Sequence, residues 1–189
     1  MTERVDTDRD LVSAAQRGDG VAFDELVRRH TGAMYRVAFR ILNDRAEAED
    51  AVQDAWVSAW RSLPRFRGDA APTTWLYRVV TNAALGRVRR RRPAVPVDTS
   101  DEALSPLLSD RDSGDPAGHA VRCEEAELVH RAIAALEPSQ RAPLVLREFE
   151  GMSYEQIAEV LEVNTAALRA RVHRARLALL ERLEEMRRG

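Results

Sequence analysis

Apolar residues recur every three or four positions along most of the first 92 residues, which is the spacing of amphipathic α-helices. This pattern predicts four helices, and Gly18, Pro64 and Pro93 mark the ends of three of them. The expected helices span about Asp10–Arg17, Val21–Leu42, Ala46–Leu63 and Thr73–Arg91. No stretch alternates between apolar and polar residues as a β-strand does, so the pattern predicts an all-α fold.

The helical pattern stops before the segment 93–119 and returns at about Ala120. The segment is rich in Pro, Ser, Asp and Gly and has no periodic apolar positions, as is typical of a flexible linker. The charges follow the same division, because the basic run RVRRRR at 87–92 precedes an acidic segment. We therefore predict two helical domains, residues 8–92 and 120–186, joined by a flexible acidic linker.

The C-terminal stretch 137–183 has the pattern of a helix, a short helix, a tight turn and an arginine-rich helix. Ser153 and Gln156 have the spacing of a capping box, which predicts that the short helix begins at the next residue after Ser153. Asn164 or Thr165 can cap the last helix. A basic helix that follows a short helix and a tight turn is the arrangement that enters the major groove of DNA. The alternative for this stretch alone is an ordinary solvated amphipathic helix.

Composition narrows the classes of function. The 189 residues are 44% hydrophobic and 32% charged and contain no long apolar run, so we expect no membrane insertion. The N-terminal MTERVDTDRD lacks a signal-peptide pattern and Cys123 is the only cysteine, and both features indicate the cytoplasm. No nucleophile–base pair or phosphate loop indicates an enzyme. His119 and Cys123 lack a second pair of zinc ligands, so we expect no metal and no cofactor.

One face of the fourth expected helix carries side chains suited to nucleic acid. Four of them fall within about one-sixth of a turn on a helical wheel: Trp75, Arg78, Asn82 and Arg89. The loop Arg65–Ala71, with Phe66 and Gly68, could form a pocket beside this face. An aromatic ring can stack on an unpaired base, an amide can bind a base edge, and arginines bind phosphates. The alternative is that Trp75 packs in the core and the arginines only solubilise the helix.

The third expected helix has a mixed surface next to its apolar stripe. It is formed by Asp50, Gln53, Val57 and Trp60. Carboxylate, amide and apolar groups side by side could dock a partner helix. They could also form an ordinary boundary between core and solvent, and the residues alone favour this second interpretation.

Three segments of the sequence, taken together and in their order along the chain, indicate a protein family. They are FDELVRRH at Phe23–His30, AEDAVQDAWVSAWRSLPRFRGDAAPTTWLYRVVTNAA at Ala48–Ala84, and Glu150–Leu179, which contains EGMSYEQIAEVLEV and RARVHRARLAL. Together they resemble bacterial RNA polymerase sigma factors of the extracytoplasmic-function class. The resemblance implies that 8–92 is sigma domain 2 and 120–186 is sigma domain 4. It also implies a factor that binds core RNA polymerase, directs it to promoters and promotes DNA melting.

The resemblance implies a site for each partner. The surface for the β′ clamp of the polymerase comprises Asp50, Gln53, Asp54, Val57 and Trp60. The surface for the promoter −10 element comprises the loop residues Arg65, Phe66, Arg67, Gly68 and Asp69, which hold a flipped base, and the helix residues Trp75, Arg78, Asn82 and Arg89. The surface for the −35 element comprises Ala166, Ala167, Arg169, Ala170, Arg171, His173 and Arg174.

The implied partners are core RNA polymerase, through its β′ clamp and β flap, promoter DNA as duplex and single strand, and an anti-sigma factor. No homo-oligomer is required. The chain departs from the family pattern at Glu162, where a turn glycine is usual, at Ala166-Ala167, where Gly-Thr is usual, and at Gly86, where a larger polar residue is common. These departures leave the −35 sequence open. The alternative function is a stand-alone helix-turn-helix transcriptional regulator, which would bind its promoter without polymerase.

Overall fold

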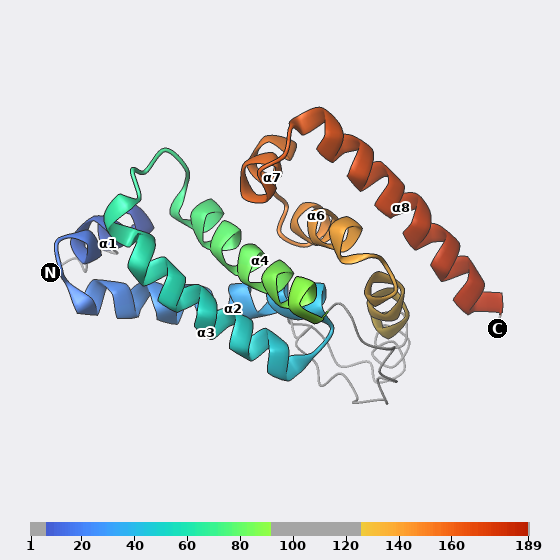
Figure 1. Cartoon of the computed structure of the whole chain (residues 1–189), viewed down its shortest axis with the longest axis horizontal. Helices are drawn as coiled ribbons and strands as arrows, with labels where there is room; N and C mark the ends of the chain where they lie inside the picture. The colour runs from blue at the N-terminus through green and yellow to red at the C-terminus, as the bar shows by residue number, and fades with distance from the viewer. Residues whose placement is uncertain (1–6, 92–125, 189) are drawn as a thin grey trace, which may run out of the picture.

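The computed structural model describes residues 7–91 and 126–188, and these residues form α-helices, one 3-10 turn and no β-strand (Figure 1). The prediction of an all-α fold is confirmed. The expected linker, 93–119, and the expected start of the second domain at Ala120 lie outside the described residues.

The first domain contains α1 (Asp8–Gln16), α2 (Gly20–Leu42), α3 (Arg45–Ser62), the 3-10 helix η1 (Leu63–Arg65) and α4 (Pro72–Arg91). The apolar pattern places these helices to within two residues, and side-chain caps explain the shifts. The hydroxyl of Thr7 and the carboxylate of Asp10 form a capping box that starts α1 two residues earlier than expected. Asp19 accepts hydrogen bonds from the backbone N–H groups of Val21 and Ala22, so α2 begins at Gly20.

The core of the first domain lies where α2, α3 and α4 meet. Its largest fully buried side chains include Leu26, Met34, Ile41 and Val80. The buried face of α3 is mostly alanine, which lets its backbone approach the neighbouring helices closely; these residues are Ala48, Ala51, Ala55 and Ala59. The half-buried Trp56 donates a hydrogen bond from Nε1 to Thr31 Oγ1 at 3.0 Å.

The second domain contains a helix at 126–134, then α6 (Pro138–Glu148), α7 (Tyr154–Leu161) and α8 (Thr165–Arg188). The predicted capping box of Ser153 and Gln156 is confirmed. Asn164 is the residue that caps α8, because its Oδ1 accepts a hydrogen bond from the N–H of Ala167 at 2.7 Å. The turn between α7 and α8 passes through Glu162, which has φ +55°.

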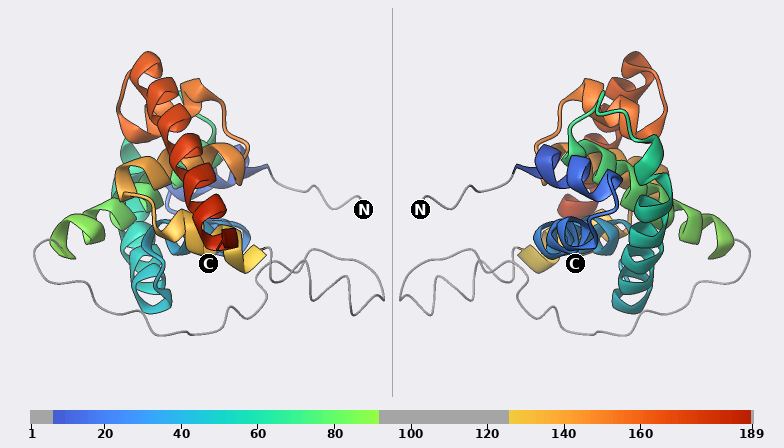
Figure 2. Two further views of the ribbon diagram at one scale, coloured as in Figure 1. Left: turned by 90° about the vertical axis from the view of Figure 1, so that its right-hand side faces the viewer. Right: turned by 90° about the vertical axis from the view of Figure 1, so that its left-hand side faces the viewer.

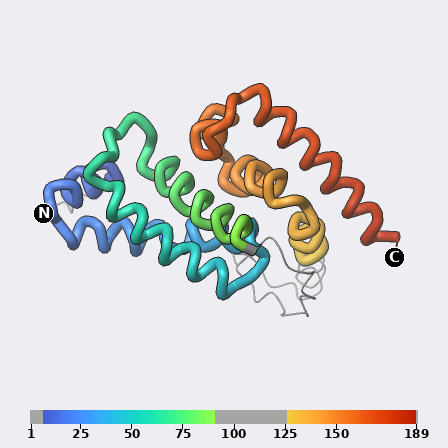
Figure 3. Tube along the Cα trace, in the orientation of Figure 1, coloured from blue at the N-terminus to red at the C-terminus, as the bar shows by residue number. Residues whose placement is uncertain are grey.

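The two domains pack against one another. α6 lies on α2 and α7 lies on α4, as the side views in Figure 2 and the trace in Figure 3 show. Buried residues of both domains form one hydrophobic cluster. The buried Arg141 of α6 donates to the carbonyl oxygen of Ile41 at the end of α2 at 2.6 Å and to that of Leu136 at 2.8 Å. Burial lowers the pKa of Arg141 to about 10.

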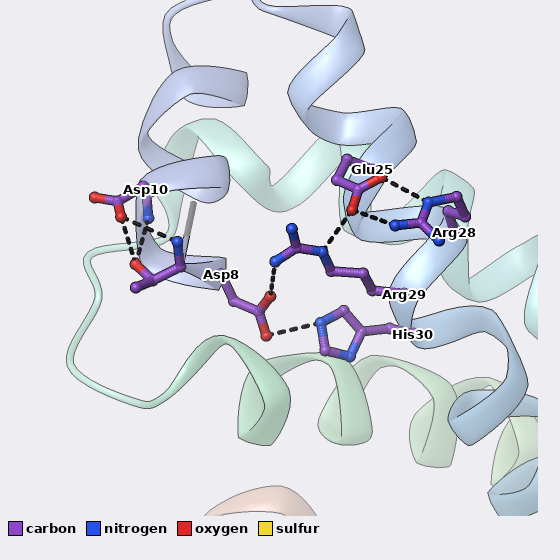
Figure 4. Close-up of polar contacts among 7 residues, drawn as sticks. Asp8, Asp10, Glu25, Arg28, Arg29 and His30 are labelled. Carbon is purple, nitrogen blue, oxygen red and sulfur yellow. Dashed lines mark hydrogen bonds and ion pairs between the residues drawn. The ribbon is translucent and has the colours of Figure 1, made fainter. Parts of the chain in front are cut away.

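The first helix is attached to α2 by a cluster of charged side chains (Figure 4). Asp8 lies 2.8 Å from Nε2 of His30 and 3.3 Å from Nη1 of Arg29. Glu25 accepts hydrogen bonds from Arg28 and Arg29, which lower its pKa to about 2. This attachment fixes α1, whose last residue reaches the candidate site described next.

Candidate polymerase- and nucleic-acid-binding surfaces

The predicted mixed surface on α3, which we call the α3 face, is exposed. It comprises Asp50, Gln53, Asp54, Val57 and Trp60. Val57 is 50% and Trp60 48% exposed, so an apolar patch lies beside the two carboxylates. Trp60 packs edge-to-face on Phe23 of α2, with ring centroids 4.8 Å apart. The ring is therefore fixed in place while about half of its residue surface stays open to a partner.

A residue that sequence analysis does not single out holds the carboxylates of this surface. Arg87 of α4 donates from Nε to Glu47, from Nη2 to Asp50 at 2.5 Å and from Nη1 to Asp54 at 2.9 Å. The hydrogen bond that Arg87 donates to Glu47 contributes most to raising the pKa of Arg87 above its usual value. In the sequence Arg87 is one of several arginines in the run at 87–92, and nothing in that run distinguishes it.

The loop after η1 borders an open cavity of about 260 Å³ beside α4. Its lining includes Arg65, Phe66, Arg67, Asp69, Trp75 and Arg78, and also Glu159 of α7. Gln16 at the end of α1 fixes this loop, because its Nε2 donates to the carbonyl oxygens of Leu63 at 2.9 Å and Phe66 at 2.6 Å. Gly68 has φ +78°, a conformation that favours glycine. The structure thus brings the predicted loop residues together.

The expectation that Trp75 stands exposed on α4 is wrong. Trp75 is 9% exposed and belongs to the hydrophobic core, with its ring 4.9 Å from that of Phe66 between centroids. The helical wheel assumed that α4 packs along one stripe. In the structure α4 packs on the first domain and also on α7, so little of its surface remains free. A role for Trp75 at the rim of the cavity stays a prediction.

The remaining predicted residues of α4, Arg78, Asn82 and Arg89, form what we call the α4 face. Asn82 and Arg89 are exposed. Arg78 forms an ion pair of 2.7 Å with Glu162, in the turn of the second domain. The second domain therefore supplies a carboxylate to one of the residues that sequence analysis assigns to DNA.

A second carboxylate of the same domain, Glu150, lies next to α4 and α2. Tyr77 donates a hydrogen bond from its hydroxyl to Glu150 at 2.5 Å, and burial together with this contact raises the pKa of Tyr77. Arg40 lies 3.7 Å from Glu150 and stacks over the ring of Phe149 at 4.3 Å from its centroid. Sequence analysis does not identify these interdomain contacts, because the partners are more than 70 positions apart along the chain.

The predicted −35 residues lie at the N-terminal half of α8 but do not share one surface. Ala166, Arg169, Ala170, His173 and Arg174 are exposed. Arg169 lies 3.6 Å from Glu155 and 5.5 Å from the ring centroid of Tyr154. Arg171 is half-buried and lines a second cavity of about 280 Å³ together with Arg89 of α4, and Ala167 is also half-buried.

The described residues contain no group of three or more His, Cys, Asp or Glu side chains that could hold a metal ion. His119 and Cys123 lie outside the described residues. Within 7–91 and 126–188, no helix is both long and apolar enough to cross a membrane.

Comparisons with known proteins identify two matched segments of the chain. Residues 26–94 match the family model for Sigma-70 region 2, and residues 126–179 match that for Sigma-70, region 4. The chain is 38% identical over 185 residues to RNA polymerase sigma-H factor of Pseudomonas aeruginosa, covering 95% of each chain. It is 33% identical over 190 residues to the ECF RNA polymerase sigma-E factor of Escherichia coli, covering 98% of each. The chain belongs to the extracytoplasmic-function sigma factors.

The fold of this sigma factor is also that of a solved relative. The structure of CnrH in complex with the cytosolic domain of CnrY has a TM-score of 0.69 and 29% sequence identity, and the match covers 95% of this chain and 99% of CnrH. As a member of this family the protein is a transcription initiation factor and not an enzyme.

Proposed function

We propose that this sigma factor binds core RNA polymerase through the α3 face, holds the −10 non-template strand at the 65–71 loop and the α4 face, and contacts the −35 element through α8. The cavity beside the loop carries the proposal. Its lining combines aromatic rings and arginines, and the exposed amide Asn82 follows one helical turn after the lining residue Arg78 on α4. Such groups capture an unpaired base. Melting is promoted because capture offsets the loss of base stacking and pairing.

The α3 face fits a protein partner better than DNA. Its two aspartates would repel phosphates, and its half-exposed tryptophan is the type of residue that dominates protein interfaces. We propose that Asp50 and Asp54 meet basic groups of the β′ clamp while Val57 and Trp60 bury apolar surface against it. Gln53 lies between the two aspartates along α3 and adds a donor and an acceptor.

The exposed residues of α8 fit duplex DNA. Arg169, His173 and Arg174 project from the N-terminal half of a helix that follows a tight turn, the part that enters a major groove. Arg171 lines the cavity shared with α4, so it reaches DNA only after the two domains separate. The same holds for Arg78, whose guanidinium is paired with Glu162.

We further propose that α6, α7 and α8 move away from α2 and α4 when polymerase and promoter bind. The interface includes several polar contacts, such as Tyr77–Glu150 and His130–Asn43, which water can replace when the domains separate. Partner proteins could act on this step. CnrH was solved with the cytosolic domain of CnrY, and we propose an anti-sigma factor as a partner of this chain too.

Transcription in vitro tests the function. Core polymerase and this protein are incubated with fragmented genomic DNA of the source organism, and the transcripts are sequenced. We expect initiation at a set of promoters that share −10 and −35 elements, and none of these transcripts with core polymerase alone. Specific binding of promoter DNA by the isolated protein, without initiation on adding core polymerase, would instead support the stand-alone regulator, against which the family assignment argues.

A further inference from the structure

Arg87 lies between two helices of the first domain, α3 and α4, which carry the α3 face and the α4 face. Arg87 is on α4, yet its guanidinium lies against α3. Each of its three nitrogen atoms donates a hydrogen bond to a different carboxylate. Its side chain is 16% exposed, whereas those of Asp50 and Asp54 are each 58% exposed. The cation is therefore recessed, and a partner that approaches α3 meets the aspartates first.

The spacing on α3 explains why a cation is needed there. Glu47, Asp50 and Asp54 are separated by three and four residues, so they lie on one face over two helical turns. Like charges at such spacing destabilise a helix and turn away from one another. Only a planar guanidinium has donors spread widely enough to bind all three at once, because a lysine ammonium acts as a point charge.

Each aspartate contacts Arg87 through Oδ2 alone. The second oxygen of each carboxylate remains available to an outside donor, and the side chain is already fixed in one orientation. Groups that are fixed before binding lose less conformational entropy when the complex forms. The polymerase surface would therefore meet a preorganised pair of acceptors, together with the fixed ring of Trp60.

We propose that Arg87 is a positioning residue for polymerase docking: it orients Asp50 and Asp54 so that their free oxygens face the β′ clamp. The inference rests on the proposed use of the α3 face. It adds a residue from the helix that also carries Asn82 and Arg89, so one helix supports both the polymerase-binding and the strand-binding surfaces.

The variant Arg87→Lys tests the proposal because it keeps the charge and loses the three-way geometry. Affinity of the full-length protein for core polymerase is measured by fluorescence anisotropy, with thermal unfolding followed in parallel. We expect the affinity to fall roughly three- to tenfold, since several fixed contacts lose their orientation. Arg90→Lys, an exposed arginine on the same helix, is the matched control and should keep wild-type affinity.

A double-mutant cycle separates positioning from a purely structural link between α3 and α4. Asp54→Asn should weaken binding in the wild-type background and weaken it much less in Arg87→Lys, because coupled residues are not additive. A structural link alone would lower the melting temperature and leave the two effects on affinity additive. Glu47→Gln, which loosens one attachment of Arg87, provides a second variant with a smaller expected loss of affinity.

The outcomes distinguish this inference from the proposed function. If Asp50→Asn and Asp54→Asn weaken binding but Arg87→Lys and Glu47→Gln bind as wild type, the docking surface stands and positioning by Arg87 is wrong. Tighter binding by Arg87→Lys would show that Arg87 competes with the polymerase, which also overturns the inference. Wild-type affinity in both aspartate variants would remove the docking surface and the inference together.

Discussion

The α3 face and the α4 face lie on neighbouring helices but differ in how accessible they are to a partner. On α3 the aspartates and Trp60 are exposed, and Arg87 and Phe23 hold them in place from behind. On α4 the second domain lies over part of the surface and Glu162 occupies Arg78. The difference indicates an order of events, because the proposed polymerase-binding surface is accessible in this conformation and the proposed DNA-binding surface is only partly so.

The largest effect is expected on the α3 face, the more accessible of the two surfaces. Trp60→Ala removes the main apolar group of the α3 face, and we expect a loss of about 2–4 kcal/mol in binding to core polymerase. Titration of labelled protein with core polymerase measures it. Because the ring is half exposed, thermal stability should fall much less than affinity. Wild-type affinity would show that the open surface is not where the polymerase binds.

The next largest effect is expected on the α4 face, which the second domain partly covers. Asn82→Ala removes an exposed amide one helical turn after Arg78, which lines the loop cavity, and we expect open-complex formation to weaken by about 1–3 kcal/mol, the range for a side chain that contacts a base edge. Permanganate footprinting of unpaired thymines measures it. A premelted promoter should restore part of the loss, because the cost of melting is then already met. Normal thymine reactivity in Asn82→Ala would show that this face does not capture the strand.

A smaller effect is expected at the contact that covers α4. Glu162→Gly removes the ion pair with Arg78 and places glycine at a positive φ, which should relieve about 1 kcal/mol of backbone strain. The turn between α7 and α8 should therefore be at least as stable, while the second domain separates from α4 more often. Spin labels on α4 and α7, read by electron–electron resonance, should report longer distances.

A control variant isolates the two contributions at this position. Glu162→Gln keeps the strained turn and removes only the charge, so it should lengthen the distances without stabilising the turn. Because both side chains of the pair are partly exposed, the ion pair itself contributes about 0–1 kcal/mol. Unchanged distances in both variants would show that the apolar contacts of α7, and not Glu162, hold the second domain on α4.

The smallest effect is a pH dependence of the domain contact. His130 stacks on Phe39 and lies 2.7 Å from Asn43 Oδ1, and burial, then Arg40 and Arg141, lower its pKa below 6.5. The unfolded chain therefore takes up a proton at a higher pH than the folded one. The contribution of His130 to stability is complete above pH 6.5 and is lost as the pH falls through the lowered pKa.

Thermal unfolding at pH 7.5 and 5.5 measures this contribution. The wild type should lose more stability than His130→Gln across that interval, because only the wild type must protonate a buried imidazole whose pKa is lowered. Other groups titrate equally in both proteins, so the difference belongs to His130. Equal losses in the two proteins would contradict the assignment.

Local features of this fold are predictable from sequence, and contacts between distant segments are not. Helix ends follow from capping residues such as Ser153, and the exposed positions of α3 follow from its period. Trp75 is buried in the hydrophobic core with its ring against that of Phe66, a packing that a helical wheel of α4 alone does not include. Arg87 is indistinguishable from its neighbours until α3 supplies three carboxylates. The family pattern does mark Glu162 as unusual, but not that it pairs with Arg78.

The amide of Gln16, which comes from outside the loop beside the cavity, donates to the carbonyl oxygens of Leu63 and Phe66 and so holds this loop. Leu63 and Phe66, the partners of that amide, are not part of the α3 face, so the proposed polymerase binding and strand capture would depend on different parts of the first domain. A protein that lacks this amide would still occupy polymerase while presenting a loosened loop to the promoter. Such a molecule would act as a competitor of the intact factor, because it would sequester the enzyme in complexes that start few transcripts.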